Sequence, residues 1–408
     1  MRETRGGTDV ADKGPQVGTP AGMRELNQRL VLERLRKQGA ATRPRIAGDT
    51  GLSKPTVGQA LLDLEQHGLV RAAGHSVPGP GRAAVVYQAA PDAGHVVGVD
   101  IGRRSIRIAV ADLEGSIVAR LDEPNRCRSA GALIRTVRDS AAKAVAEAGL
   151  SPADVVSTVV GTPGIPDPRT GTVHRAPNLP GWERKGLLRE LESALGPDLV
   201  VENDANLAAV GEHALGAALG VDVLVCLTVG TGLGLGVLIG GKLFRGANGA
   251  AGEIADLPYG QDSTARARRP GPMEDAAAGH AVVAAAQARG LAKARSAKDV
   301  FALARARNPA ALEVVEQEAV KLAYVVASVT AVLDPGLIVL GGGIGGNADL
   351  LAGPMREALA ATTPFAPDIV AGQLGEDAVL AGAIATALDT ARDLVFDRRE
   401  QRRAARGA

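Results

Sequence analysis

Three polar residues at the end of an apolar run could carry acid–base chemistry. The run Leu199–Val201 predicts a buried strand, and Glu202, Asn203 and Asp204 follow it directly before an alanine-rich helix. We expect Asp204 to cap the N-terminus of that helix, where the helix dipole favours its ionised form. An ionised carboxylate there can accept a hydroxyl proton, as a general base does in phosphoryl transfer. The simpler alternative is a structural cap without chemistry.

Three glycine-containing stretches could approach phosphate groups. "VGTGLG" (229–234) has small residues that allow backbone amides to lie close to a phosphate, and "GGGIGG" (341–346) is similar. "GVDIG" (98–102) opens like a third such turn, but Arg103 and Arg104 follow it, and a long side chain would occupy the place of a phosphate oxygen. The alternative is that two arginines bind an anion.

The elements that must position these residues alternate between strands and helices from Val96 onward. Three apolar runs predict successive strands, a long helix follows over 130–149, and further buried strands end at the residues described above. A second strand–turn–strand unit starts at Val223. This repeated pattern predicts two related α/β lobes around a cleft.

The N-terminal part has a different pattern. Its first residues are rich in Gly, Thr, Pro and charge, which predicts a disordered arm. A helical stripe from Leu26 to Leu35, a short helix over 45–50 and a helix capped by Ser53 follow, and two apolar runs around a Pro/Gly tip predict a hairpin. We expect Leu61, Leu62 and Leu64 to form the buried face of the helix that Ser53 caps. This order is typical of a winged helix-turn-helix. The alternative is a helical subdomain without a ligand.

Short polar side chains at the start of the helix capped by Ser53 are suited to DNA phosphates and base edges, and an arginine in the hairpin tip is suited to the minor groove. The candidate DNA-binding residues are Arg45, Ser53, Lys54, Pro55, Thr56, Gln59 and Arg82.

Composition limits the class of protein. With 408 residues, 46% of them hydrophobic and 22% charged, the chain is expected to form two or three globular domains. No apolar run approaches the roughly 20 residues that span a bilayer, and no secretory signal is seen. Two cysteines without CxxC spacing indicate a reducing cytoplasm rather than a disulfide framework.

Charge is distributed unevenly along the chain. Residues 22–90 carry ten Lys/Arg against five Asp/Glu, residues 398–408 carry five Arg against one Glu, and the segment between them is acidic. A basic N-terminal module on an acidic body is typical of a DNA-binding domain attached to a sensing domain.

Four motifs give the body a family resemblance: "VENDANLAAVGE" (201–212), "LTVGTGLGLGVLIGGKLFRGANGAAGEI" (227–254), "APNLPGW" (176–182) and "LIVLGGGI" (337–344). Together they resemble the ROK family of repressors, open reading frames and sugar kinases. The resemblance implies an α/β body of the actin-like, ribonuclease H-like fold with two lobes. Members with a winged helix-turn-helix include xylose and N-acetylglucosamine repressors.

The resemblance also implies a sugar site. Asp204 matches the base of the family's kinases, Asn203 matches a residue that holds sugar hydroxyls, and Glu253 matches a sugar-binding glutamate. Asp256 stands where the family usually has a histidine. The expected ligand contacts are Gly164, Asn178, Asn203, Asp204, Glu253, Asp256 and Glu274.

The family's zinc motif falls on "ARARRPGPME" (265–274), where Ala265, Ala267 and Pro272 replace all three cysteines and only Gly271 and Glu274 match. The family's first phosphate turn reads Gly-Thr where this chain has Arg103 and Arg104. We therefore expect no zinc and no ATP as cofactor.

These observations predict a transcriptional regulator, a repressor of carbohydrate-related genes, that binds operator DNA as a homodimer or dimer of dimers and responds to a sugar. The predicted domains are an arm over 1–21, a winged helix-turn-helix over 22–90, a first lobe over 95–212 plus 378–396, a second lobe over 213–377 and a basic tail over 397–408. The alternatives are an ATP-dependent sugar kinase and a DNA-binding protein whose pocket is vestigial.

Overall fold

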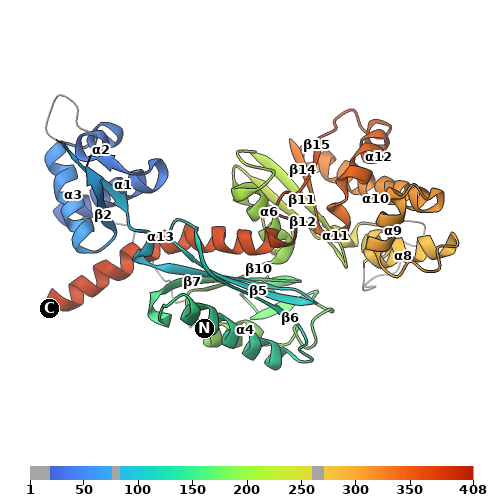
Figure 1. Ribbon diagram of the computed structural model, residues 1–408, viewed down its shortest axis with the longest axis horizontal. Helices are drawn as coiled ribbons and strands as arrows, with labels where there is room; N and C mark the ends of the chain where they lie inside the picture. Colours follow the sequence, from blue (N-terminus) through green and yellow to red (C-terminus); the bar gives the residue numbers. More distant parts are fainter. Residues whose placement is uncertain (1–18, 76–82, 260–270, 408) are drawn as a thin grey trace, which may run out of the picture. The chain divides into compact units, whose positions relative to one another are not determined.

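The computed structural model describes residues 19–75, 83–259 and 271–407 (Figure 1). The chain forms two compact units. The first contains the N-terminal part up to Gly94 together with the chain from Asp393, and the second extends from His95 to Arg392.

The first unit combines helices with a small antiparallel sheet of strand order β1-β3-β2. Its elements before residue 95 are α1 (Pro20–Gln38), β1 (Ala41–Thr42), α2 (Arg43–Thr50), α3 (Lys54–Gln66), β2 (Val70–His75), β3 (Val85–Ala89) and the short 3-10 helix η1 (Pro91–Ala93). The turn between α2 and α3 has Gly51 in the left-handed region, at a φ of 72°. Ser53 caps α3 as expected, since its hydroxyl accepts from the backbone N–H of Thr56.

Two details of this unit differ from the sequence prediction, and some predicted residues lie outside the described part of the chain. Helix α1 begins at Pro20, inside the expected arm, because the Thr19 hydroxyl caps it by accepting from Gly22 N–H at 3.1 Å. The rest of that arm, residues 1–18, lies outside the described residues, as does Arg82. Leu62, expected on the buried face of α3, is 49% exposed.

The end of the chain also differs from the predicted domain boundaries. Helix α13 (Ala378–Gly407) continues through the segment assigned to a basic tail, and from Asp393 onward it belongs to the first unit. Val395 and Phe396 are buried there, and the guanidinium carbon of Arg29 in α1 lies 4.4 Å from the centre of the Phe396 ring. These apolar and cation–π contacts explain why the segment packs with the N-terminal residues.

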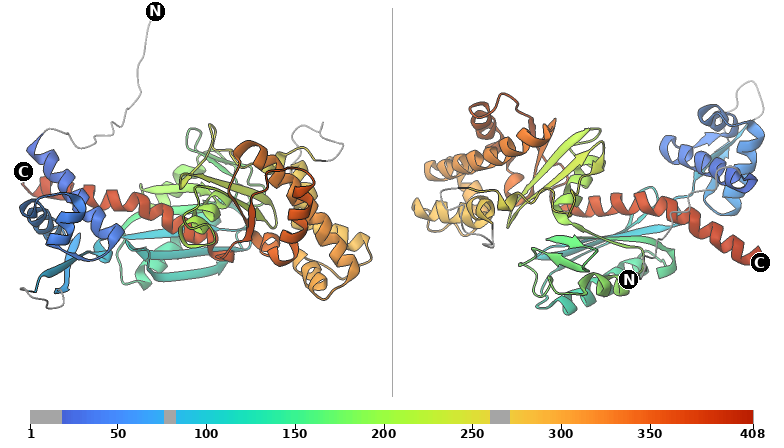
Figure 2. Two further views of the ribbon diagram at one scale, coloured as in Figure 1. Left: turned by 90° about the horizontal axis from the view of Figure 1, so that it is seen from above. Right: turned by 180° about the vertical axis from the view of Figure 1, so that it is seen from behind.

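The first lobe of the second unit has a five-stranded sheet of order β10-β7-β4-β5-β6. Strands β4 and β5 pair antiparallel, and β7 pairs parallel with β4. Helix α4 covers one face of this sheet (Figures 1 and 2). The elements are β4 (His95–Ile101), β5 (Ser105–Asp112), β6 (Ile117–Pro124), α4 (Ala130–Glu147), η2 (Pro152–Asp154), β7 (Val155–Thr162), β8 (Ile165–Asp167), β9 (Thr172–His174), α5 (Leu187–Leu195), β10 (Leu199–Asn203) and α6 (Asp204–Leu215).

The second lobe repeats this topology with the order β13-β12-β11-β14-β15. Strands β11, β12 and β13 form an antiparallel meander. Strands β14 and β15 come later in the chain and extend the sheet from β11 by parallel pairing, as β7 and β10 do in the first lobe. The strands are β11 (Val223–Val229), β12 (Leu233–Ile239), β13 (Lys242–Leu243), β14 (Leu337–Gly341) and β15 (Asp368–Ala371). The expectation of two related α/β lobes therefore agrees with the two sheets.

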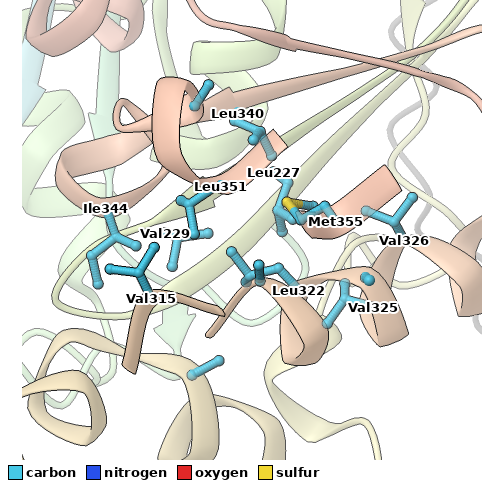
Figure 3. Packing of buried hydrophobic residues seen from close by; sticks show 14 of the residues in the cluster. Leu227, Val229, Val315, Leu322, Val325, Val326, Leu340, Ile344, Leu351 and Met355 are labelled. Carbon is cyan, nitrogen blue, oxygen red and sulfur yellow. The ribbon is translucent and has the colours of Figure 1, made fainter. Parts of the chain in front are cut away.

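The helices of the second lobe pack on its sheet. They are η3 (Ile254–Asp256), α7 (Pro272–Ala277), α8 (Gly279–Ala288), α9 (Ala297–Arg305), α10 (Pro309–Leu333), α11 (Gly342–Gly345), α12 (Ala348–Ala360) and η4 (Gly375–Asp377). Figure 3 shows the core they form, in which Leu227 and Leu340 of the sheet meet Leu322 of α10 and Met355 of α12. This core fixes the sheet whose edge carries the glycine-rich segments.

Helix α6 and the first part of α13 approach each other backbone to backbone. A Cβ atom added at Gly382 would lie 1.8 Å from the Leu207 carbonyl oxygen, and one at Gly211 would lie 2.2 Å from the Ala378 oxygen. Glycine is required at both positions because any side chain would overlap the opposite helix.

Trp182 anchors the "APNLPGW" loop, and this contact gives a first prediction. Its ring is fully buried, and its indole N–H donates to the Thr162 hydroxyl at 2.8 Å. Trp182→Phe should lower the free energy of unfolding by about 1–3 kcal/mol, because a buried hydroxyl loses its donor. Urea denaturation measures this loss. The same substitution in a Thr162→Val background should cost clearly less, and an equal cost in both backgrounds would contradict the assigned bond.

Candidate functional site

A cleft of about 470 Å³ in the second unit is lined by residues of both lobes. Its volume falls within the range of about 300–1,000 Å³ that is usual for small-molecule sites. Six of the seven expected ligand contacts line it: Gly164, Asn178, Asn203, Asp204, Glu253 and Glu274. The seventh, Asp256, is joined to the lining residue Arg175 by an ion pair.

Asn203, not Asp204, caps helix α6. The Asn203 side-chain oxygen accepts from the backbone N–H groups of Ala205 and Asn206 at 2.9 and 3.1 Å. Its side-chain nitrogen donates to the Gly164 carbonyl oxygen at 2.9 Å. The prediction that Asp204 is the cap was wrong, because Asp204 is already the first helical residue and the cap position falls on Asn203, the last residue of β10.

Asp204 lines the cleft, and the pKa of its carboxyl is raised. Burial raises the pKa of its carboxyl, and this effect outweighs the backbone N–H groups that lower it. The helix dipole alone would favour the ionised form, so burial reverses the direction of the pKa shift expected from the sequence. A carboxylate with a raised pKa is a better proton acceptor near neutral pH.

Glu202 holds this segment in place, a role that the sequence argument did not assign. Its buried carboxylate accepts from Asn206 Nδ2 at 2.9 Å, from Asn203 N–H at 2.9 Å and from Arg245 Nε at 2.6 Å. These bonds fix the start of α6 on both sides of Asp204.

Arg175 ties two acidic residues of the cleft together and was also missed. It forms a bidentate ion pair with Asp256, in which the Nη2–Oδ1 distance is 2.7 Å. Its Nε also lies 3.4 Å from a carboxylate oxygen of Glu253. Its backbone has a φ of 62°, which is unusual for a residue other than glycine. The only signal in the sequence was its position directly before "APNLPGW".

Glu253 therefore lies in a strongly acidic part of the cleft. Burial raises the pKa of its carboxyl, Arg175 opposes the rise, and Asp256, Asp204 and Glu274 add to it. Carboxylates in such a group accept hydrogen bonds from the hydroxyl groups of a polar ligand.

Glu274 occupies a defined place although the zinc cysteines are missing. Its Oε2 accepts from the Leu233 backbone N–H at 3.1 Å. Ala265 and Ala267 lie outside the described residues, and Pro272 begins α7. Within the described parts of the chain, no group of three or more His, Cys, Asp or Glu side chains is arranged to hold a metal ion.

Helix α10 holds both ends of the segment that carries the former zinc motif. Lys321 Nζ donates to the Ala276 carbonyl oxygen at 2.7 Å, and the Tyr324 hydroxyl donates to the Pro258 oxygen at 3.0 Å. Gly271 also packs tightly, since a Cβ there would lie 2.3 Å from the Ala255 oxygen. These contacts fix Glu274 and η3 relative to the sheet without cysteine ligands.

The other side of the cleft contains Asp100, which is paired with an arginine. Arg107 Nη1 lies 3.0 Å from Asp100 Oδ2, and its Nη2 is bonded to Glu376. Burial, with a contribution from Asp204, raises the pKa of Asp100 from 3.8 to about 6. Arg107 and Glu376 were not predicted, because 269 residues separate them in the chain.

Arg103 lines the cleft beside the glycine-containing turns. Gly102 donates its backbone N–H to the Ser105 oxygen at 2.9 Å, and Gly230 donates to the Gly232 oxygen at the same distance. Thr231, Gly232 and the segment Gly341–Gly343 line the same side. The Gly102 and Gly230 N–H groups are thus bonded within their own turns, and the Arg103 side chain stands beside these turns on the cleft wall.

Asp100 provides a second prediction, on the pH dependence of stability. Its folded-state pKa is raised above the unfolded value, so the unfolded chain loses this proton at lower pH than the folded chain does. The free energy of unfolding should therefore fall as the pH rises from about 4 to 6, by an amount on the order of 3 kcal/mol. Asp100→Asn should remove this fall and be more stable than the parent at pH 7.

Urea denaturation from pH 4 to 7 checks this, with the exposed Asp139 of α4 replaced by Asn as the control. An Asp100→Asn variant that shows the parent's pH dependence would contradict the assignment.

The candidate DNA-binding residues that the structure describes lie on the first two turns of α3, including its cap, and near the start of α2. Ser53, Lys54, Pro55 and Gln59 are exposed, and Thr56 is half-buried. Gln59 Nε2 donates to Asp63 Oδ1 at 2.8 Å. Arg45 is exposed on α2 and pairs with Asp49 at 3.1 Å. The helix thus presents a polar surface.

Comparison with known proteins finds relatives of the second unit. Residues 96–390 match the sequence model described as the ROK family. A glucokinase of Halalkalibacterium halodurans is 32% identical over 278 residues, 64% of this chain and 84% of that protein. A xylose repressor of Caldicellulosiruptor bescii is 31% identical over 244 residues, 58% of this chain and 60% of the repressor.

Among solved structures, the chain resembles a ROK family transcriptional regulator described as a homolog of the E. coli MLC protein. The TM-score is 0.75 at 20% identity, over 92% of this chain and 98% of that one. The fold is therefore shared along most of the chain. None of the helices in the described residues is long and apolar enough to cross a membrane.

Proposed function

The chain belongs to the ROK family, and on that premise we propose that it is a DNA-binding transcriptional regulator, a repressor of carbohydrate-related genes whose cleft binds a sugar or sugar derivative. The observation that carries the proposal is the N-terminal unit, in which α3 presents exposed polar side chains ahead of the family body. A kinase needs no such unit.

The geometry of α2 and α3 supports DNA binding through a winged helix-turn-helix. The start of α3 would enter the major groove, where Thr56 and Gln59 can reach base edges and Lys54 a phosphate. The hairpin of β2 and β3 would act as the wing. Operator sites of roughly palindromic sequence follow if the protein acts as a homodimer or a dimer of dimers.

The state of Asp100 supports the loss of phosphoryl transfer. A kinase of this family needs a small, flexible phosphate turn, whereas here Arg103 lies in the cleft and Arg107 is bound to the Asp100 carboxylate. Phosphoryl transfer depends on the positioning of the phosphates, and the long Arg103 side chain stands in the turn where kinases of the family have a glycine.

Regulation would follow from ligand binding in the cleft. A ligand changes DNA affinity only if it binds one conformation of the protein more tightly than the other. The sugar would contact Asn203, Asp204 and Glu253 and bring residues of both lobes together.

Selection of bound fragments from genomic DNA, followed by release assays with a panel of sugars, tests the proposal. The expected result is enrichment of sequences with two related half-sites and release by one class of sugar. Absence of any sequence preference at physiological salt would overturn it. If DNA is bound but no sugar changes the melting temperature, the vestigial-pocket alternative holds, since a ligand of the folded state must raise it.

A sugar kinase is the second candidate, favoured by the raised pKa of Asp204 beside glycine-rich segments and by the glucokinase relative. An ADP-release assay with hexoses and amino sugars decides between the two. Turnover that Asp204→Asn abolishes would replace the regulator proposal with the kinase.

A further inference from the structure

Asp63 on α3 joins a candidate base-contacting side chain to helix α1. Its Oδ1 accepts from Gln59 Nε2 and its Oδ2 accepts from Gln28 Nε2, both at 2.8 Å. Gln28 belongs to α1 and is only 2% exposed, whereas Asp63 is half-buried and Gln59 is exposed on α3. Two hydrogen bonds therefore connect the interior of the N-terminal unit to the surface proposed to bind DNA.

The bond to Gln28 distinguishes this arrangement from an ordinary surface pair. Gln59 and Asp63 are four residues apart, and a hydrogen bond between exposed side chains at this spacing stabilises a helix only weakly. Here a buried donor from another helix holds the second carboxylate oxygen, so the position of Asp63 is fixed independently of Gln59. Asp63 can then fix the Gln59 amide instead of moving with it.

The chemistry of the carboxylate decides which way the Gln59 amide points. A carboxylate only accepts hydrogen bonds, so the amide nitrogen must face Asp63 and the amide oxygen must face away from it. In the part of the chain that the structure describes, this is the only hydrogen bond of the Gln59 side chain. The carbonyl oxygen and one N–H of the amide remain for a ligand.

The four bases differ in how well they match an amide held in this way. In the major groove, adenine offers a donor at N6 beside an acceptor at N7, which together match one carbonyl oxygen and one N–H. Guanine offers two acceptors, and thymine offers an acceptor and a methyl group, so neither can donate to the carbonyl oxygen. Cytosine offers only the donor at N4 and leaves the N–H of the amide without an acceptor.

We infer that Asp63 is a positioning residue that makes Gln59 read adenine. Asp63 acts through the Gln59 amide and contacts no base itself. The inference rests on the proposed DNA-binding function, and it adds the base that one position of each operator half-site must carry.

Fluorescence anisotropy with the full chain and a set of operator duplexes tests this inference. Each duplex carries one of the four base pairs at one position of the selected sequence. The position that Gln59 reads is the one at which Gln59→Ala removes the base preference. The parent should prefer adenine over guanine there by about 10- to 100-fold in affinity.

Asp63→Asn should reduce this ratio to about threefold or less. An asparagine amide can donate as well as accept, so the Gln59 amide can then bind it in either orientation. Preferences at the other operator positions should stay as in the parent.

Glu65→Gln is the matched control, because Glu65 is an exposed carboxylate on the same helix and its replacement changes the charge by the same amount. Both variants should bind every duplex somewhat more tightly, since a charge that repels phosphates is removed. Only Asp63→Asn should change the ratio of adenine to guanine.

Several results would overturn the inference: a preference for another base at the Gln59 position, no position that responds to Gln59→Ala, or an adenine preference that survives Asp63→Asn. An equal effect of Glu65→Gln, or an equal loss at all operator positions in Asp63→Asn, would overturn it as well. Failure of the proposed function is distinguishable, because the parent would then show no preferred sequence at all, and the inference would fall with it.

Discussion

Replacing Gly382 by alanine is expected to lower the free energy of unfolding of the cleft-bearing unit by about 3 kcal/mol or more. The added Cβ would lie 1.8 Å from the Leu207 carbonyl oxygen, and the atom it meets is backbone of α6, which cannot rotate away. Helix α13 must then shift from α6. Since Ala378 and Val379 at the start of α13 line the cleft, ligand affinity should fall as well. Urea denaturation followed by circular dichroism measures the loss of stability.

A second helical glycine provides the control. Gly131 in α4 has only Arg135 Nη1 within 4 Å of its added Cβ, at 3.6 Å, which is an ordinary contact. Gly131→Ala should leave stability unchanged or raise it by up to about 1 kcal/mol, because alanine favours helix. If Gly382→Ala is tolerated as well as Gly131→Ala, the close approach of α6 and α13 is wrong.

The double substitution of Thr56 and Gln59 by alanine is expected to reduce affinity for the selected operator by about 100-fold. Each side chain that contacts a base edge contributes about 1–3 kcal/mol of discrimination, so the loss should be specific to the operator sequence. Ser53 is not a suitable site for this test, because its removal would also uncap α3. Fluorescence anisotropy with operator and scrambled duplexes measures both affinities.

Gln38→Ala is the matched control, since Gln38 is an exposed glutamine at the end of α1 in the same unit. It should bind both duplexes as the parent does. Equal losses on operator and scrambled DNA in the double variant would indicate that α3 contacts only the backbone, against the proposed base contacts.

Much of the fold could be predicted because local patterns determine it. The apolar runs before "END" and around the glycine stretches lie in the strands they predicted, and Ser53 caps the helix expected to follow it. Leu62 was misassigned because helical spacing alone does not distinguish a core position from a surface position where the helix presents its free face.

The candidate site was predicted only in part. Asn203 and Asp204 were found because their chemistry is local to one strand end, although a shift of one residue changed which of them caps α6. The bonds of Arg175 to Asp256 and of Arg107 to Glu376 were missed because 81 and 269 residues separate the partners in the chain. The direction of the Asp204 pKa was missed for a related reason, since burial depends on walls that other segments supply.

The matching topology of the two sheets makes two of the cleft's turns counterparts. Strands β4 and β5 are joined by residues 102–104, and β11 and β12 are joined by 230–232, so both turns have three residues between antiparallel strands. Gly-Arg-Arg in one therefore corresponds to Gly-Thr-Gly in the other. The turn 230–232 is therefore an internal reference for the turn 102–104. Replacing residues 102–104 by Gly-Thr-Gly would keep the length of the turn and remove both arginines.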